Sequence, residues 1–264
     1  MFGLEDYELF GQQFSIEDTR DDLRMLVDYF KSQDYWEEAM RAAIVDYRQL
    51  PFDVAITSEA FAVDEDTTVG SLPEWMTQEH LGFVTKGKYL TQAGRLVFPV
   101  KDVRGNIAGF VGWDPFVQPK YLDSKNYGYK AKQSMFYGME MLPTYYTNKE
   151  PVIVTEGMMD TLYLRSEGFQ AMASLGSYLT PYMVAILKRF GDRLIMIPDN
   201  DSTGDNYVAQ CKRVLPKALV YQVAYGKDVE GCRRIEEHKY EEQLLKELRS
   251  IKNPFVRTQL LIRR

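Results

Sequence analysis

Residues 151–160, PVIVTEGMMD, and residues 195–205, IMIPDNDSTGD, decide the fold of this chain. Each stretch begins with a short apolar run and ends in acidic residues, and a segment with helical character follows it. The pattern predicts strands at 151–155, 194–197 and 218–223, and helices at 158–167, 180–189 and 206–214. Strands that alternate with helices in this way predict a parallel sheet covered by helices.

Acidic side chains follow all three predicted strands. They are Glu156 and Asp160 after the first strand, Asp199 and Asp201 after the second, and Asp228 and Glu230, preceded by Lys227, after the third. Because ligands of an open parallel sheet bind outside the carboxyl ends of its strands, we expect these side chains to converge. Taken singly, each acid also fits a helix N-terminus or a loop. Carboxylates that converge repel one another unless a cation lies among them, and hard oxygen ligands select Mg²⁺ or Mn²⁺.

The composition excludes several classes of protein. The chain has 264 residues, of which 45% are hydrophobic and 27% charged, as in an ordinary soluble globular protein of one or two domains. It lacks an apolar run of about 20 residues, and its first residues are acidic, so we expect a cytoplasmic protein without a membrane partner. Two cysteines and two histidines cannot form a disulfide framework or a zinc ribbon, and they disfavour Ser/His/Asp and Cys/His catalysis.

The net charge of −6 is distributed unevenly along the chain. Residues 1–85 contain 19 acidic and 5 basic residues, whereas residues 86–132 contain 9 basic and 3 acidic ones. A basic segment inside an acidic protein is compatible with a phosphate-bearing partner such as a nucleic acid, and equally with a solvated face.

The pattern of elements suggests four regions. Residues 1–85 are expected to be largely helical, with helices at 16–30, capped by Ser15, and at 36–47, followed by a loop rich in acids. Residues 86–148 are expected to form a basic α+β subdomain that contains a hairpin with strands at 96–100 and 107–113. Residues 149–232 contain the predicted parallel sheet, and residues 233–264 an amphipathic helix over 233–252. The predicted fold class is therefore mixed α+β and α/β.

The order of the acidic motifs resembles a known module. The strand followed by Glu156-Gly157-x-x-Asp160, then Asp199-x-Asp201-x-x-Gly204 and Gly226-Lys227-Asp228, is similar to the Toprim module of bacterial-type DNA primases, topoisomerases and some nucleases. Upstream, residues 94–113 (GRLVFPVKDVRGNIAGFVGW) and 120–138 (KYLDSKNYGYKAKQSMFYG) resemble the block that precedes Toprim in DnaG-type primases. Topoisomerases and nucleases do not carry that block. The likeness covers about residues 94–230.

The resemblance implies roles for individual residues. Its implied metal ligands are Glu156, Asp199, Asp201 and Asp228, with Asp160 and Glu230 in support, and Glu156, Asp199 and Asp201 are the implied catalytic residues. The implied contacts to nucleotide or template are Arg95, Lys120, Tyr121, Lys132 and Lys227. The implied reaction is synthesis of short RNA primers on single-stranded DNA from ribonucleoside triphosphates. It would proceed by phosphoryl transfer with two Mg²⁺ or Mn²⁺ ions and without zinc.

Two departures from the family pattern widen the range of interpretations. The family's amino-terminal zinc ribbon is absent, and no GxxxxGK[ST] sequence indicates a fused helicase. The chain is then either a reduced, viral primase that depends on partners such as a replicative helicase or a separate zinc-domain initiation factor, or a catalytic core fragment. A Toprim-type metal-dependent nuclease and a non-catalytic nucleic-acid-binding subunit of a replisome remain as alternatives.

Overall fold

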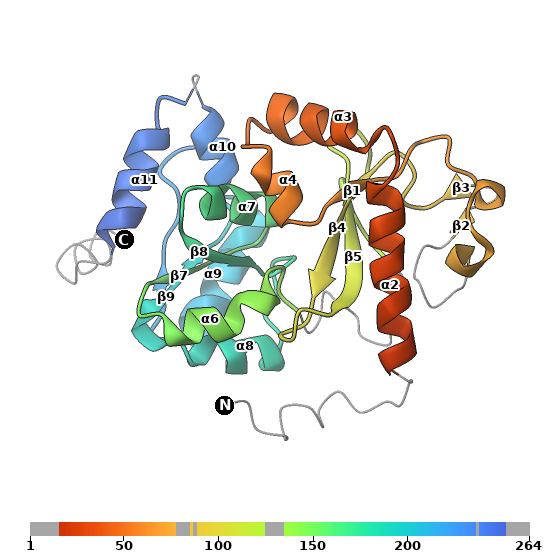
Figure 1. The fold of residues 1–264 in the computed structure, drawn as a ribbon. Helices are drawn as coiled ribbons and strands as arrows, with labels where there is room; N and C mark the ends of the chain where they lie inside the picture. Colours follow the sequence, from red (N-terminus) through yellow and green to blue (C-terminus); the bar gives the residue numbers. More distant parts are fainter. Residues whose placement is uncertain (1–15, 78–84, 87–88, 125–134, 236–237, 252–264) are drawn as a thin grey trace. The chain divides into compact units, whose positions relative to one another are not determined.

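The computed structural model describes residues 16–77, 85–86, 89–124, 135–235 and 238–251 (Figure 1). The chain forms two compact units, residues 1–131 and residues 132–264. The predicted parallel sheet lies in the second unit, and the predicted hairpin lies in the first. The finer division into regions 1–85, 86–148, 149–232 and 233–264 stays a prediction.

The sheet of the second unit has four parallel strands in the order β10-β9-β7-β8. The strands are β7 (Val152–Thr155), β8 (Gln170–Ala173), β9 (Leu194–Ile197) and β10 (Leu219–Val220). Every residue of β7 and β9 is buried, as expected for central strands of a parallel sheet that is covered on both faces. The last residues of β7 and β9 are register partners, so the loops after the two strands start side by side.

Helices cover both faces of this sheet. The helical segments of the unit are η5 (Met139–Met141), α6 (Leu142–Thr147), α7 (Met158–Ser166), α8 (Pro181–Lys188), η6 (Gly191–Arg193), α9 (Ser202–Val214), α10 (Val229–Arg234) and α11 (Glu241–Ser250). The chain moves one way along the sheet from β7 to β8 and the other way from β8 to β9 and β10. Right-handed crossovers therefore place α7 on one face and α8 and α9 on the other. Figure 1 shows α7 beside α10, with α8 across the sheet.

The predicted alternation of strands and helices is confirmed, with differences in individual elements. Strand β8 was not predicted, because QAMA is short and has neither a β-branched nor an aromatic residue. The predicted strand 218–223 narrows to β10. The predicted helix over 233–252 is wrong: the chain leaves the helical conformation at Ile235 and has a positive φ of 71° at His238, so α10 and α11 are separate.

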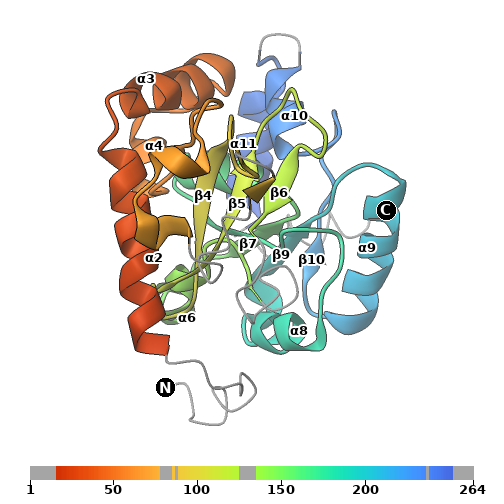
Figure 2. The same ribbon diagram turned by 90° about the vertical axis from the view of Figure 1, so that its right-hand side faces the viewer.

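The first unit contains a four-stranded antiparallel sheet in the order β1-β4-β5-β6, of which Figure 2 labels β4, β5 and β6. Its strands are β1 (Phe61–Ala62), β4 (Leu96–Lys101), β5 (Ile107–Trp113) and β6 (Tyr121–Asp123). The predicted hairpin is confirmed as β4 and β5, and Asp102 Oδ1 accepts hydrogen bonds from the backbone N–H groups of Arg104 and Asn106 in its turn.

Helix α2 (Ile16–Lys31) packs against this sheet and confirms the predicted amino-terminal helix. Its side chains Leu26 and Phe30 share one buried cluster with Phe61 and Phe110, and the Phe30 and Phe61 rings stack with centroids 5.2 Å apart. The predicted cap, Ser15, lies outside the described residues.

The remaining elements of the first unit are short. They are α3 (Trp36–Met40), the π-helical segment η1 (Arg41–Tyr47), α4 (Asp53–Thr57), the 3₁₀ turns η2 (Val69–Ser71) and η3 (Glu74–Thr77), and the paired strands β2 (Thr85–Lys86) and β3 (Tyr89–Leu90). The predicted helix 36–47 is thus an α-helix that continues as a π-helix. Within the described part of the chain, none of the helices is long and apolar enough to cross a membrane.

Candidate metal centre

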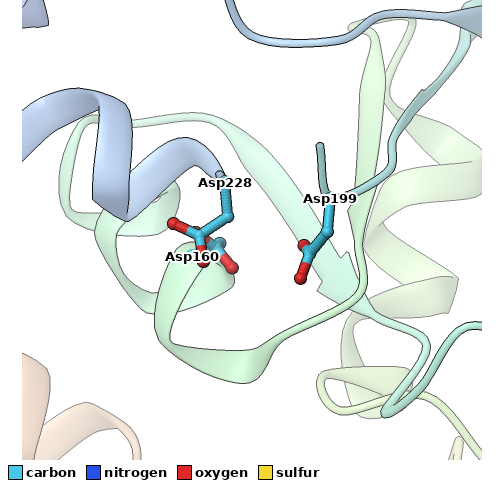
Figure 3. A group of neighbouring side chains, drawn as sticks. All are labelled: Asp160, Asp199 and Asp228. Atoms are coloured by element: carbon cyan, nitrogen blue, oxygen red, sulfur yellow. The ribbon is translucent and has the colours of Figure 1, made fainter. Parts of the chain in front are cut away.

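Three carboxylates from three separate elements meet at the carboxyl end of the parallel sheet. Asp160 lies in the first turn of α7, Asp199 follows β9, and Asp228 is the N-cap of α10. Each offers one carboxylate oxygen, and these oxygens lie within 4.8 Å of one another. Figure 3 shows Asp160 and Asp228 next to each other, with Asp199 facing them. We call these three residues the carboxylate triad.

Backbone N–H groups hold two carboxylates of the triad, those of Asp228 and Asp160, in place. Asp228 Oδ1 accepts a hydrogen bond from Gly231 N at 2.6 Å, which begins α10. Asp160 Oδ1 accepts one from Glu230 N at 2.8 Å and so ties α7 to α10. Asp160 is only 5% exposed, so its carboxylate is fixed inside the protein.

Glu156 and Asp201 lie beside the triad. Glu156 Oε1 accepts a hydrogen bond from Asp199 N at 3.0 Å, which ties the end of β7 to the end of β9. Asp201 is the N-cap of α9, and its Oδ1 accepts hydrogen bonds from Thr203 N and Gly204 N. This cap starts α9 at Ser202, earlier than the predicted residue 206.

Gly204 is required for this arrangement because α9 starts so close to Asp199. A Cβ atom at position 204 would lie 1.9 Å from the Asp199 carbonyl oxygen, which belongs to the backbone and cannot rotate away. The glycine in the Asp-x-Asp-x-x-Gly motif is therefore what permits the close approach of the helix to the metal-site loop.

The electrostatics of the site differ from acid to acid. Burial, together with the charges of Asp199 and Asp201, raises the pKa of Glu156 to about 7. Burial and the neighbouring Asp228 raise the pKa of Asp160 well above its usual value, and burial also raises the pKa of Asp199. Hydrogen bonds from Gly204 N and Lys227 lower the pKa of Asp201, which stays ionised. The triad is therefore a group of carboxylates whose joint ionisation is unfavourable without a cation.

Lys227 and Glu230 complete the predicted set. The Lys227 ammonium lies 3.1 Å from Asp199 Oδ2 and 3.1 Å from Asp201 Oδ2. The Glu230 side chain lies 3.7 Å from the Arg233 guanidinium and 3.9 Å from that of Arg234, instead of joining the triad. Its backbone N–H contributes by bonding Asp160. Arg233, which is 2% exposed, was not predicted as part of this site; its spacing of three residues from Glu230 was the signal available.

Three of the predicted nucleic-acid contacts, Arg95, Lys120 and Tyr121, lie in the first unit. Lys120 is exposed, and Tyr121 is half-buried at the start of β6. Arg95 is 6% exposed, and its guanidinium donates hydrogen bonds to the carbonyl oxygens of Lys120 and Pro119 at 3.2 and 3.0 Å. The structure thus shows Arg95 supporting the loop before β6. Lys132 lies outside the described residues.

Comparisons with known proteins agree with this architecture. Residues 153–231 match the family described as Toprim-like. The DNA primase of Helicobacter pylori is 30% identical over 131 residues, which is 49% of this chain and 23% of the relative. The chain therefore spans about a quarter of that relative's length.

Solved structures show the same fold over most of the chain. A structure of the DnaG catalytic core has a TM-score of 0.70 and 22% identity, covering 92% of this chain and 88% of that one. A DnaG primase catalytic domain bound to single-stranded DNA has a TM-score of 0.68 and 24% identity, with coverages of 88% and 80%. The predicted resemblance is therefore confirmed: this chain contains a Toprim-like domain within the fold of the DnaG primase catalytic core.

Proposed function

We propose that this chain is the catalytic core of a DNA primase, which synthesises short RNA primers on single-stranded DNA. The observation that carries the proposal is the convergence of Asp160, Asp199 and Asp228 from α7, the loop after β9 and α10. The similarity to DNA primases, and to a primase domain whose structure contains single-stranded DNA, supports the choice of reaction. The same metal and acids would serve a nuclease, so the reaction product decides between the two.

The donor set fits one or two divalent cations. The triad supplies hard oxygen ligands only, and its mutual repulsion is relieved by a cation of charge two. We propose that the triad holds one Mg²⁺ or Mn²⁺ ion and that Asp199, Asp201 and Glu156 hold a second. Bound there, the ions would activate the primer 3′-hydroxyl and neutralise charge on the triphosphate.

The protein's own groups do the positioning. The backbone bonds to Glu156, Asp160 and Asp228 fix three carboxylates before any ligand arrives, so little reorganisation is needed when substrate binds. We propose that Lys120, Tyr121 and Lys132 contact the template or the nucleotide, since lysine binds phosphate as a point charge. A replicative helicase or a zinc-domain initiation factor is proposed as a partner.

Primer synthesis by the full chain tests this function. The protein is incubated with single-stranded DNA, the four ribonucleotides and Mg²⁺ or Mn²⁺, and labelled products are resolved on a gel. We expect short RNA from the wild-type chain and at least a hundredfold less from Asp199→Asn, because a ligand shared by both proposed ions is lost. Asp205→Asn, an exposed acid in the first turn of α9, is the matched control and should keep full synthesis.

Each contrary result has a distinct meaning. Shortened DNA in place of new RNA would establish the nuclease. Binding of DNA without either product, with and without a preformed primer, would establish a non-catalytic subunit. Undiminished synthesis by Asp199→Asn would contradict the assignment of the metal centre while leaving the primase activity in place.

A further inference from the structure

Lys227 lies in the place where a second cation would find its ligands. Its ammonium is equidistant, at 3.1 Å, from Asp199 Oδ2 and Asp201 Oδ2. The other oxygen of Asp201, Oδ1, is already used to cap α9 through the amides of Thr203 and Gly204. Oδ2 is thus the oxygen that Asp201 can offer to a metal ion, and the lysine binds that same oxygen.

The backbone fixes the loop that carries this lysine. The Lys227 carbonyl oxygen accepts a hydrogen bond from Asn200 N at 2.5 Å. The side-chain amide of Asn200 donates to the carbonyl oxygens of Val223 and Gly226 at 2.9 and 3.1 Å. In the sequence, Asn200 lies between Asp199 and Asp201, the two partners of the Lys227 ammonium. The hydrogen bonds of Asn200 therefore hold the backbone of Lys227 close to both aspartates.

The side chain itself can leave. Lys227 is 57% exposed, and its ammonium ends a flexible four-carbon stem that water can solvate. Its contacts are two ion pairs to partly exposed carboxylates, each of modest strength. The backbone of Lys227 is therefore fixed near the site, whereas its ammonium can move. A divalent cation can then take the place of the ammonium at the two carboxylates.

We propose that Lys227 is a built-in counter-cation that competes with the second divalent ion for Asp199 and Asp201. The inference rests on the metal centre of the proposed function. With no divalent ion at this position, the ammonium neutralises the two carboxylates. When a divalent ion binds there, the ammonium moves away and becomes available to a phosphate group of the substrate. Removing the lysine therefore strengthens metal binding, whereas a lysine that only braces the loop would leave it unchanged or weaker.

The competition is tested by isothermal titration calorimetry, in which Mn²⁺ is added to the full chain in the absence of nucleotide. We expect Lys227→Gln to bind Mn²⁺ about three- to tenfold more tightly than the wild-type chain, the factor that two partly exposed ion pairs amount to. Lys227→Arg retains the positive charge and should bind Mn²⁺ like the wild type. Lys212→Gln, which removes an exposed lysine from α9, is the matched control and should change the affinity less than twofold.

The outcomes separate this inference from the proposed function. Tighter binding by Lys227→Gln alone supports the competition. Binding that is equal to or weaker than that of the wild type overturns it and leaves the metal centre standing. If neither protein binds Mn²⁺, both the competition and the metal centre are wrong. Circular dichroism of each variant confirms that it is folded, which is expected for a side chain more than half exposed.

Discussion

The two units of this chain position their candidate functional side chains in different ways. In residues 132–264 the acids are held by backbone N–H groups at strand ends and helix N-termini, as seen for Glu156, Asp160, Asp201 and Asp228. In residues 1–131 the side chain of Arg95, which is 25 positions from Lys120 in the sequence, joins the backbone N–H of Asp114 in holding the loop that carries Lys120.

This difference explains why the positions of the acids could be predicted from the sequence, whereas the contact of Arg95 with the loop could not. A backbone N–H is present at every strand end and helix start, so the spacing of acids around predicted strands is enough to place them. A link from one buried arginine to two distant carbonyl groups leaves no spacing pattern.

The largest effect is expected at Gly204, where the backbone of the metal-site loop is closest to α9. In Gly204→Ala the new Cβ would overlap the Asp199 carbonyl oxygen, and the start of α9 must shift. We expect the free energy of unfolding of this unit to fall by about 3 kcal/mol, as for severe overpacking, and Mn²⁺ binding to be lost. Urea unfolding and calorimetry measure the two effects.

A glycine in the other unit provides the control. Gly70 has no atom within 4 Å of the position that a Cβ would take, so Gly70→Ala should leave both quantities almost unchanged. Equal stability of Gly204→Ala and the wild type would show that the site tolerates a displaced helix and that backbone fit is not what holds it.

A smaller effect is expected at Arg95, where the support is a side chain. Arg95→Met removes the hydrogen bonds that Arg95 donates to the carbonyl groups of Pro119 and Lys120, of which Lys120 keeps the bond from Asp114 N. The loss should cost about 2 kcal/mol of unfolding free energy. Affinity for single-stranded DNA should fall as well, because the loop that carries Lys120 is no longer fixed. Urea unfolding and fluorescence anisotropy with labelled DNA measure these effects.

Lys120→Ala is the control for Arg95→Met, because it removes a proposed phosphate contact without removing the support of the loop. Lys120 is exposed, so its removal should change stability by less than about 0.5 kcal/mol. It should also reduce the slope of log affinity against log salt by about 0.7, the value for one phosphate contact on a single strand. If Arg95→Met behaves like Lys120→Ala, with DNA affinity reduced and stability intact, then Arg95 contacts the nucleic acid directly.

Much of the second unit follows from its sequence, for physical reasons that individual residues illustrate. The apolar runs of β7 and β9 are buried on both faces, so their hydrophobicity marks them without help from their surroundings. Strand β8 is different, because Gln170–Ala173 has no β propensity of its own and forms by pairing with β7. The break between α10 and α11 is likewise set by tertiary packing. The local sequence does not reveal it, because the leucines of α11 continue an amphipathic pattern.

In the candidate site, too, the sequence alone does not determine the arrangements that depend on tertiary packing. The convergence of the acids at one edge of the sheet was predicted, but which three of them form the triad was not. Asp160, expected only as a supporting ligand, belongs to the triad, whereas the Glu230 side chain faces Arg233 and Arg234. Sequence spacing places a residue at a sheet edge but cannot decide which way a side chain turns there. That choice depends on the packing of α7 against α10, which only the folded chain shows.

The smallest expected effect is a difference in pH dependence between two glutamates, one in each unit. Burial raises the pKa of Glu156 to about 7 from 4.5. For Glu59, burial alone would raise the pKa, but hydrogen bonds from Lys101 and Arg24 lower it overall. The proton is therefore favoured by the folded state at Glu156 and disfavoured at Glu59, so the two contributions to stability change with pH in opposite directions.

These opposite directions are measured by unfolding the metal-free protein in the presence of a chelator at a series of pH values. The stability of the wild type relative to Glu156→Gln should be greatest below pH 4.5 and fall by about 1–2 kcal/mol as the pH rises through 7, less than the full shift because the group is partly exposed. Relative to Glu59→Gln, stability should be retained above pH 4.5 and lost as the pH falls below it. Mn²⁺ favours ionised ligands, so it should oppose the fall at Glu156 and leave Glu59 unaffected. Parallel slopes for both glutamates, with and without Mn²⁺, would contradict the contrast between a carboxylate that needs a bound cation and one already paired within the fold.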